Sequence, residues 1–188
     1  MRHSFSFRGF VIGQQDKAEA DVILSLLTKN RGKLLAQAKG LRKITSKRLG
    51  ALQTGNLVKG QIHQKGDFLV LGDVELVKAP LKLRRDLVAC GMVLTMSELI
   101  NRLLPERQEN ESVYYLFEKT LKDLKKEVKP ETMIDFEVEL LKILGYGLPR
   151  EIDQSLKDKD LKSAQGKLWQ YLTQIAERKL IGLGKILG

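Results

Sequence analysis

The order of hydrophobic and polar positions divides the chain near residue 80. Before that point, apolar residues alternate with polar ones or form short runs bounded by Gly, Asn and Asp, which is typical of strands in a small barrel. The five predicted strands cover residues 5–12, 22–28, 33–38, 57–63 and 68–77. Hairpin turns are predicted at Asn30-Arg31-Gly32 and Lys65-Gly66-Asp67. Strands of this number and length favour a five-stranded β-barrel of the OB-fold type, which hides its edges by closure.

After Pro80, apolar residues recur every three or four positions, which predicts helices. Residues 83–104 are apolar on most faces and should form a buried central helix that Pro105 stops. Further helices are expected over residues 112–128, from Pro130 to the Gly145-Tyr146-Gly147 stop, and over residues 163–179, with a polar connecting segment at residues 149–162. The fold class is therefore α+β, with an N-terminal OB-fold domain over residues 1–80 and an all-helical C-terminal domain over residues 81–188.

The composition is that of a globular protein, with 43% hydrophobic and 30% charged residues among 188. The longest apolar stretch, residues 87–96, is too short to span a bilayer, which takes about 20 residues. The N-terminus lacks the pattern of a secretory signal, so we expect a cytoplasmic protein without a membrane segment. Cys90, His3 and His63 do not form a cluster in the sequence, and no metal or cofactor is expected.

Positive charge is concentrated in the predicted barrel. The chain has 33 Lys and Arg against 23 Asp and Glu, a net charge of +10. Residues 1–80 hold 14 cations and 6 carboxylates, net +8, whereas residues 81–188 hold 19 and 17, net +2. Between Asp21 and Asp67 there is no acidic residue, although this stretch holds ten Lys and Arg. Such a run repels itself unless a polyanion neutralises it, which points to salt-sensitive binding of nucleic-acid phosphates.

The densest part of this run, residues 39–48, has few apolar residues for a core element. We predict a long basic loop between the third and fourth strands that projects from the barrel and wraps a sugar-phosphate backbone, with hydroxyl contacts from Thr45 and Ser46. The alternative is a basic loop that is merely solvated. Aromatic side chains that stack on bases would be candidates as well, but alternation favours core packing for each of them: Phe5, Phe7, Phe10 and Phe68.

The sequence contains none of the motifs that would indicate another mode of action. It has no helix-turn-helix, zinc-finger or zipper spacing, so sequence-specific DNA reading is not expected. It also lacks a phosphate-binding glycine loop, a dinucleotide-binding fingerprint and a nucleophile elbow. We therefore expect a non-enzymatic protein.

The order and spacing of several fragments resemble the RecO family of recombination mediators. The fragments are Gly9-Phe10-Val11-Ile12, residues 18–28, Gly32-Lys33-Leu34, Ala38-Lys39-Gly40, residues 46–49, Ala51-Leu52-Gln53, residues 83–87 and Leu144-Gly145-Tyr146. The resemblance implies an OB-fold, a helical C-terminal domain, and binding and annealing of single- and double-stranded DNA. It also implies work in DNA repair with RecR and the C-terminal tail of single-strand-binding protein, which helps to load RecA.

The family's basic DNA-binding surface maps onto residues within the cationic stretch, namely Arg31, Lys33, Lys39, Arg42, Lys43, Lys47 and Arg48. Arg84 and Arg85 either contact DNA or anchor the junction between the domains. Many relatives carry a four-cysteine zinc site where this chain has residues 147–152 without cysteine, so no zinc is expected. Thr54-Gly55 and the C-terminal residues 181–188 also depart from the family pattern.

Two hypotheses of other classes compete with a DNA repair mediator. An OB barrel with basic loops also suits structured RNA, as in an accessory factor for ribosomes or tRNA. A structural interaction protein would match its basic half to an acidic protein partner. Competition between single-stranded DNA and folded RNA, and binding at physiological salt, would separate the three.

Overall fold

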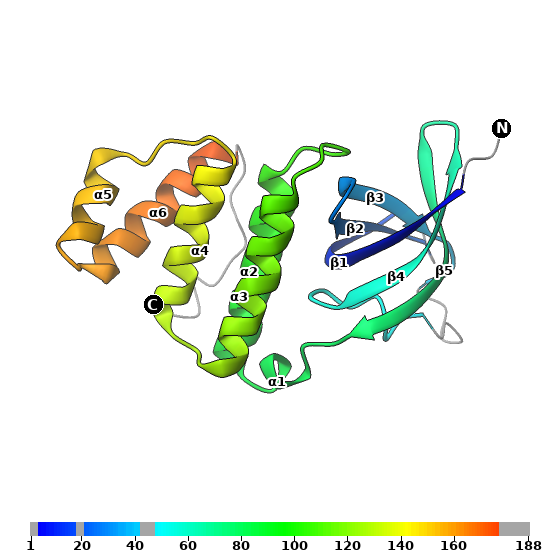
Figure 1. The fold of residues 1–188 in the computed structure, drawn as a ribbon, viewed down its shortest axis with the longest axis horizontal. Coiled ribbons are helices and arrows are strands. Elements are labelled where there is room, and N and C mark those ends of the chain that lie inside the picture. The colour runs from blue at the N-terminus through cyan, green and yellow to red at the C-terminus, as the bar shows by residue number, and fades with distance from the viewer. Residues whose placement is uncertain (1–3, 18–20, 42–47, 177–188) are drawn as a thin grey trace. The chain divides into compact units, whose positions relative to one another are not determined.

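The computed structural model describes residues 4–17, 21–41 and 48–176. The chain forms two compact units (Figure 1). The first consists of Met1–Leu81 with Leu104–Tyr114, and the second of Lys82–Leu103 with Tyr115–Gly188. We call them the barrel unit and the helical unit. Each is described by itself.

The barrel unit contains five strands that close in the order β1-β2-β3-β5-β4. They are β1 (Ser4–Asp16), β2 (Val22–Thr28), β3 (Gly32–Ala38), β4 (Leu57–Lys65) and β5 (Phe68–Lys78). The long strand β1 pairs antiparallel with both β2 and β4, and a shift of register after Val11 bends it from one neighbour to the other. A short parallel contact between β3 and β5 closes the ring. The predicted five-stranded, OB-like barrel followed by helices is confirmed.

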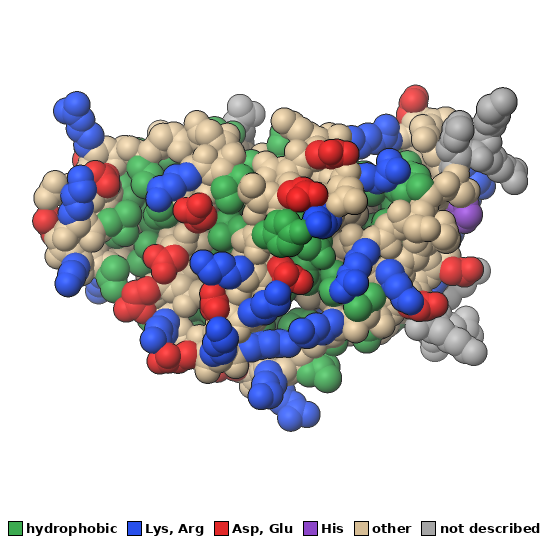
Figure 2. All heavy atoms as spheres, viewed as in Figure 1, with side chains coloured by type: hydrophobic (Ala, Val, Ile, Leu, Met, Phe, Trp, Pro, Cys, Tyr) green, Lys and Arg blue, Asp and Glu red, His purple; other side chains and the backbone are tan. Residues whose placement is uncertain are grey.

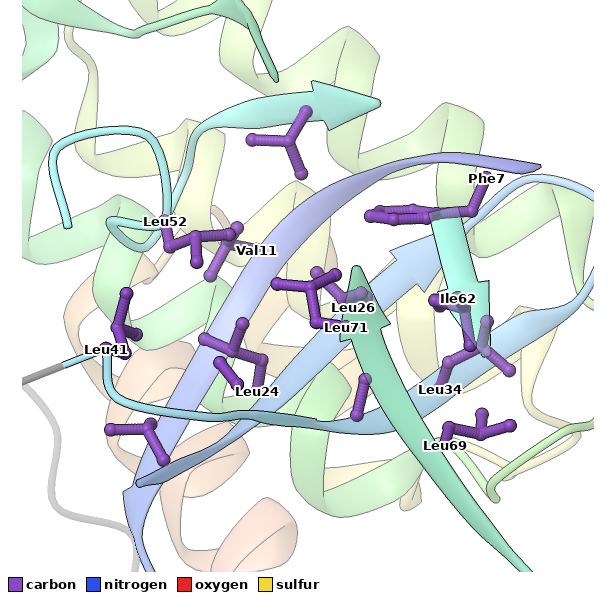
Figure 3. Packing of buried hydrophobic residues seen from close by; sticks show 14 residues of the cluster. Phe7, Val11, Leu24, Leu26, Leu34, Leu41, Leu52, Ile62, Leu69 and Leu71 are labelled. Carbon is purple, nitrogen blue, oxygen red and sulfur yellow. The ribbon is translucent and has the colours of Figure 1, made fainter. Parts of the chain in front are cut away.

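The interior of the barrel is an apolar cluster that extends beyond the strands. Figure 3 shows Leu41 and Leu52 at one end of the cluster, and Phe7 and Ile62 at the other. Leu41 and Leu52 belong to the connection between β3 and β4, and both are fully buried. Residues 39–48 were expected to have too few apolar residues for a core element, yet Leu41 belongs to the core from its position in a turn, because a barrel end needs an apolar side chain to close it.

The four aromatic residues of the barrel differ in their surroundings. Phe7 and Phe10 are buried, and the Phe10 ring lies 5.2 Å from that of Tyr114. Phe5 is half-buried against the cluster. Phe68, however, is 66% exposed, so the expectation of core packing is wrong there. Phe68 opens β5, and alternation along this strand turns Leu69 inward and Phe68 outward.

A segment distant in sequence completes the barrel unit. The amide of Arg107 donates a hydrogen bond of 2.8 Å to the carbonyl oxygen of Lys33. Gly32 has a positive φ of 60°, and a Cβ built there would lie 1.8 Å from the carbonyl oxygen of Gln108. Only glycine permits both this turn conformation and this close approach of the two backbones.

The helical unit follows the predicted helices with two differences. Its elements are α1 (Leu81–Arg84, whose first residue belongs to the barrel unit), α2 (Leu87–Leu103), α3 (Glu111–Lys126, whose first turn belongs to the barrel unit), α4 (Pro130–Ile143), α5 (Arg150–Lys157) and α6 (Leu161–Ile175). The predicted helix over residues 83–104 is divided at Asp86, whose carboxylate accepts a hydrogen bond of 2.9 Å from the Ala89 amide. Leu87 at its start is 73% exposed rather than buried.

The second difference is α5, which occupies most of the segment that was expected to be a polar connection. Its eight residues bury only Ile152 and Ser155, so the apolar signal in the sequence is weak. The last predicted helix begins slightly earlier, at Leu161, with Asp160 accepting a hydrogen bond from the Ser163 amide. Within the described parts of the chain, every helix is too short or too polar to cross a membrane.

Candidate nucleic-acid interface

The basic segment between β3 and β4 is held at its root by a carboxylate. Asp21 accepts hydrogen bonds of 2.8 Å from the Gly40 amide and 2.7 Å from the Gln37 side chain. The Gly40 hydrogen bond, followed by that of Gln37, holds the pKa of the Asp21 carboxyl below its ordinary value. Asp21 therefore fixes the place where the chain leaves β3, and Lys39 is exposed beside it.

Arg48 joins the two ends of the basic segment. Its guanidinium donates hydrogen bonds to the Lys39 carbonyl oxygen at 2.6 Å and to the Gly72 carbonyl oxygen at 3.4 Å. The start and the end of the segment therefore lie side by side at β5. Arg42, Lys43 and Lys47, together with the hydroxyl residues Thr45 and Ser46, lie outside the described residues.

Arg31 lies at the other end of β3. It is exposed in the turn between β2 and β3, and its guanidinium carbon is 4.2 Å from the centroid of the Phe5 ring. Among the described residues, the contact that the structure shows for this planar cation is with the ring face and not with a carboxylate, and its edge is left to solvent. Arg31 and Lys39 flank the strand eight residues apart, which corresponds to about 26 Å of extended chain.

Lys33 differs from the other predicted contact residues because its side chain is 7% exposed. Burial lowers the pKa of its ammonium group, and the nearby Glu106 opposes that shift. The backbones of the two residues also form a bridge. Lys33 therefore serves the packing of residues 104–114 against β3, and we assign it a structural role.

Lys17, which the sequence did not single out, lies next to this surface together with the ring of Phe68, for which core packing was expected. The Lys17 Nζ is 5.3 Å from the centroid of the exposed Phe68 ring and donates a hydrogen bond of 3.3 Å to the Gln37 side chain. Gln37 in turn donates to Asp21, which holds Gly40. One chain of contacts therefore connects Phe68 to the root of the basic segment. In the sequence, the signal for this contact is that Lys17 and Phe68 both lie beside predicted turns or strand ends.

A shallow hollow of about 540 Å³ lies elsewhere on the barrel, on the outer face of β1, β4 and β5. Arg8 and Lys59 line it, but Asp73 and Glu75 line it as well. Lys59 forms an ion pair of 2.8 Å with Glu75. A polyanion would meet carboxylates there, so this hollow suits phosphates less well than the surface around Lys39 does.

Two further sequence expectations concern other parts of the molecule. Among the described residues, no three His, Cys, Asp or Glu side chains form a group that could hold a metal ion. Arg84 is half-buried and Arg85 is exposed, and these exposures do not choose between contact with DNA and a structural role. Cys90 is a half-buried free thiol on α2.

The chain is similar to two known protein families, which together cover most of its length. The family described as Recombination protein O N terminal matches residues 1–80, and that described as Recombination protein O C terminal matches residues 84–151. A DNA repair protein RecO of Coxiella burnetii is 31% identical over 163 residues, which cover 87% of this chain and 68% of that protein. A DNA repair protein RecO of Symbiobacterium thermophilum is 33% identical over 144 residues, which cover 76% of this chain and 57% of that protein.

Among solved structures, a chain in the crystal structure of the S. pombe Stn1-ten1 complex aligns over 52% of this chain and 77% of that one. The TM-score is 0.32 and the sequence identity 15%, a likeness too low to support an argument. The matches to both RecO regions, and the 31% identity to a RecO protein over two thirds of its length, show that the chain belongs to the RecO family of DNA repair proteins.

Proposed function

We propose that this protein is a mediator of DNA repair and recombination that holds single and double strands by their phosphates and anneals complementary strands. The observation that carries the proposal is that both ends of the basic segment, at Gly40 and at Arg48, are held by hydrogen bonds. Asp21 and Arg48 hold the two ends of this segment at the barrel, and the segment contains five cations from Lys39 to Arg48. Two DNA strands that approach each other there would have their mutual repulsion screened.

The proposed contact residues follow from the positions described above. Lys39 and Arg31 present exposed cations at the two ends of β3, while Arg42, Lys43 and Lys47 belong to the segment between the fixed ends. Arg48 positions that segment and adds charge beside it. The buried Lys33 lies where residues 104–114 pack against β3. The protein acts without catalysing a covalent reaction and without a cofactor.

The dependence of DNA affinity on salt tests this assignment. Replacing Arg42, Lys43 and Lys47 by Ala should flatten the slope of log affinity against log salt by up to about 2.7 on a duplex, at about 0.9 per phosphate contact. A matched variant with Lys122, Lys126 and Lys142 replaced by Ala removes the same charge from the helical unit and should leave the slope unchanged. Equal slopes in all three proteins would refute the assignment to the basic segment.

Annealing of complementary oligonucleotides then tests the activity rather than the charge. The wild-type protein should accelerate pairing of the two strands, and the basic-segment variant should do so less. Folded RNA that displaces single-stranded DNA at equal concentration would instead favour an RNA-binding role.

Family membership leads us to propose protein partners as well. They are RecR and the C-terminal tail of single-strand-binding protein, with which the protein would help to load RecA in the cytoplasm. We assign their docking to the helical unit, where lysines pair with carboxylates and side chains such as Leu87 are exposed. Titration of purified RecR into the full chain by calorimetry checks the first of these contacts.

A further inference from the structure

Phe68 is the exposed aromatic residue nearest to the proposed phosphate-binding surface. Its side chain is 66% exposed, although a ring of this size normally gains from burial. The parallel pairing of Ala36 with Leu69 sets Phe68 level with the middle of β3. It therefore lies between the Arg31 end and the Lys39 end of that strand.

Cations and hydrogen-bonding groups surround the ring. Lys17 lies over it at 5.3 Å, and Lys65 pairs with Phe68 across the hairpin between β4 and β5. Gln37 fixes Lys17 from the side of β3 with a hydrogen bond of 3.3 Å. An aromatic face flanked by positive charges at this spacing complements a nucleotide, which offers a flat base together with an anionic phosphate.

We propose that Phe68 is a stacking platform for one unpaired base, and that it makes the barrel prefer single strands over duplexes. This inference rests on the proposed function, because the phosphates on either side of the base occupy the Lys17 and Lys39 region. A base within a duplex has both faces covered by its neighbours and cannot stack on Phe68. The ring therefore adds affinity only where the strand is open.

Oligonucleotides with and without bases separate stacking from charge. The variant Phe68→Leu should bind a single strand of thymidines about 5- to 150-fold more weakly than the wild type. It should bind an abasic strand of the same length, and a duplex, as well as the wild type does. Phe68→Tyr keeps the ring and should keep the affinity. Leu76→Ala, a change at another exposed apolar residue of β5, should have no effect.

A fluorescence measurement provides an independent readout. The chain has one Trp, at position 169, so the double variant Phe68→Trp, Trp169→Phe places the only indole on the proposed platform. The thymidine strand should quench its emission, whereas the abasic strand should not. Phe68 is exposed, so these variants are expected to fold, and thermal unfolding monitored by circular dichroism checks this.

The possible outcomes are distinct. If Phe68→Leu binds the thymidine strand as tightly as the wild type, or loses affinity equally for the abasic strand, the stacking role is overturned while phosphate binding stands. If the wild-type protein binds no strand even at low salt, the proposed function fails and the stacking role fails with it.

Discussion

The barrel unit and the helical unit treat positive charge differently. In the helical unit, lysines pair with carboxylates one turn away, such as Lys122 with Glu118 at 2.8 Å and Lys157 with Asp153 at 2.6 Å. In Figure 2, blue and red side chains are interspersed over the helices. In the barrel unit, the described partners of Arg31 and Arg48 are instead a ring face and backbone carbonyl groups.

This difference supports the proposal that the barrel unit binds an external anion. The helical unit neutralises much of its charge locally, with 18 cations against 14 carboxylates in residues 82–103 and 115–188. The barrel unit positions Arg31 and Arg48 with uncharged groups, and it holds 15 cations against 9 carboxylates in residues 1–81 and 104–114. A carboxylate that pairs with a lysine competes with a phosphate for that lysine. The neutral groups that position Arg31 and Arg48 do not compete with a phosphate in this way.

The interiors of the two units also differ, and here the helical unit is the one that holds an ionisable group without an ion pair among the described residues. The barrel core is an apolar cluster, whereas α4 buries the carboxyl of Glu137, which is 3% exposed. Among the described residues, nothing donates a hydrogen bond to its Oε2. Desolvation raises the pKa of the Glu137 carboxyl to about 8. The carboxyl group is therefore mostly protonated in the folded protein at neutral pH.

The largest expected effect is a loss of stability with rising pH that arises from the buried Glu137. Below pH 4.5 the Glu137 carboxyl is protonated in both the folded and the unfolded state. Between pH 4.5 and about 8 only the unfolded state ionises, so the wild type loses stability as the pH rises, with no further loss above pH 8. Relative to Glu137→Gln, the wild type should lose up to about 5 kcal/mol across this window.

Urea unfolding of the two proteins between pH 4 and pH 9, followed by the fluorescence of Trp169 in α6, measures that difference. Because the readout is the change of the difference with pH, any constant effect of a buried amide drops out. A difference that stays flat across this range would contradict the burial of an ionisable Glu137.

A smaller effect would show that one barrel cation is structural as well as electrostatic. Arg48→Ala removes the donors to the Lys39 and Gly72 carbonyl groups and should destabilise the barrel by about 1–3 kcal/mol. Arg48→Lys should not restore the loss, because an ammonium group lacks the planar fork. Lys39→Ala is the control, since only its backbone takes part, and it should weaken DNA binding without changing stability. Hydrogen exchange of β3 and β5 amides measures the stability change.

The smallest effect concerns the ion pairs of the helical unit. Lys122→Ala breaks the pair with Glu118, and Lys142→Ala breaks the pair with Glu139 at 3.8 Å. Each change should cost less than about 1 kcal/mol in thermal unfolding, because exposed pairs on helices contribute little. Neither should alter the affinity for DNA. A loss of affinity as large as that of Lys39→Ala would contradict the proposal that the barrel unit, and not the helical unit, binds DNA.

Much of the fold could be predicted from the sequence, since alternation and helical spacing located all five strands and most helices. The errors occurred where burial depends on three-dimensional closure. Leu41 looked like a loop residue because its neighbours are basic, yet it closes the barrel end. Phe68 was expected in the core from its place in an alternating strand, but the alternation has the opposite phase, with Leu69 inward and Phe68 outward.

The candidate site was harder to predict because its contacts join distant positions. Charge counting found the basic stretch but treated its cations alike. The structure separates a buried Lys33, a positioning Arg48 and an exposed Lys39. Glu137 was missed for a related reason, because carboxylates on helices are solvated by default and nothing in the α4 sequence marks this one as buried.

The contact between Gly32 and Gln108 has a consequence for how the barrel is made during translation. The amide of Arg107 and the backbone of Gln108 complete the side of β3, so the barrel unit requires residues up to Tyr114. Because α2 precedes residues 104–114 in the chain, the ribosome must release α2 before these residues can pack against β3, although α2 belongs to the other unit. A recombinant fragment that stops at residue 80 would leave the β3 backbone at Gly32 and Lys33 without this cover, and should therefore associate with other chains more readily than the full chain does.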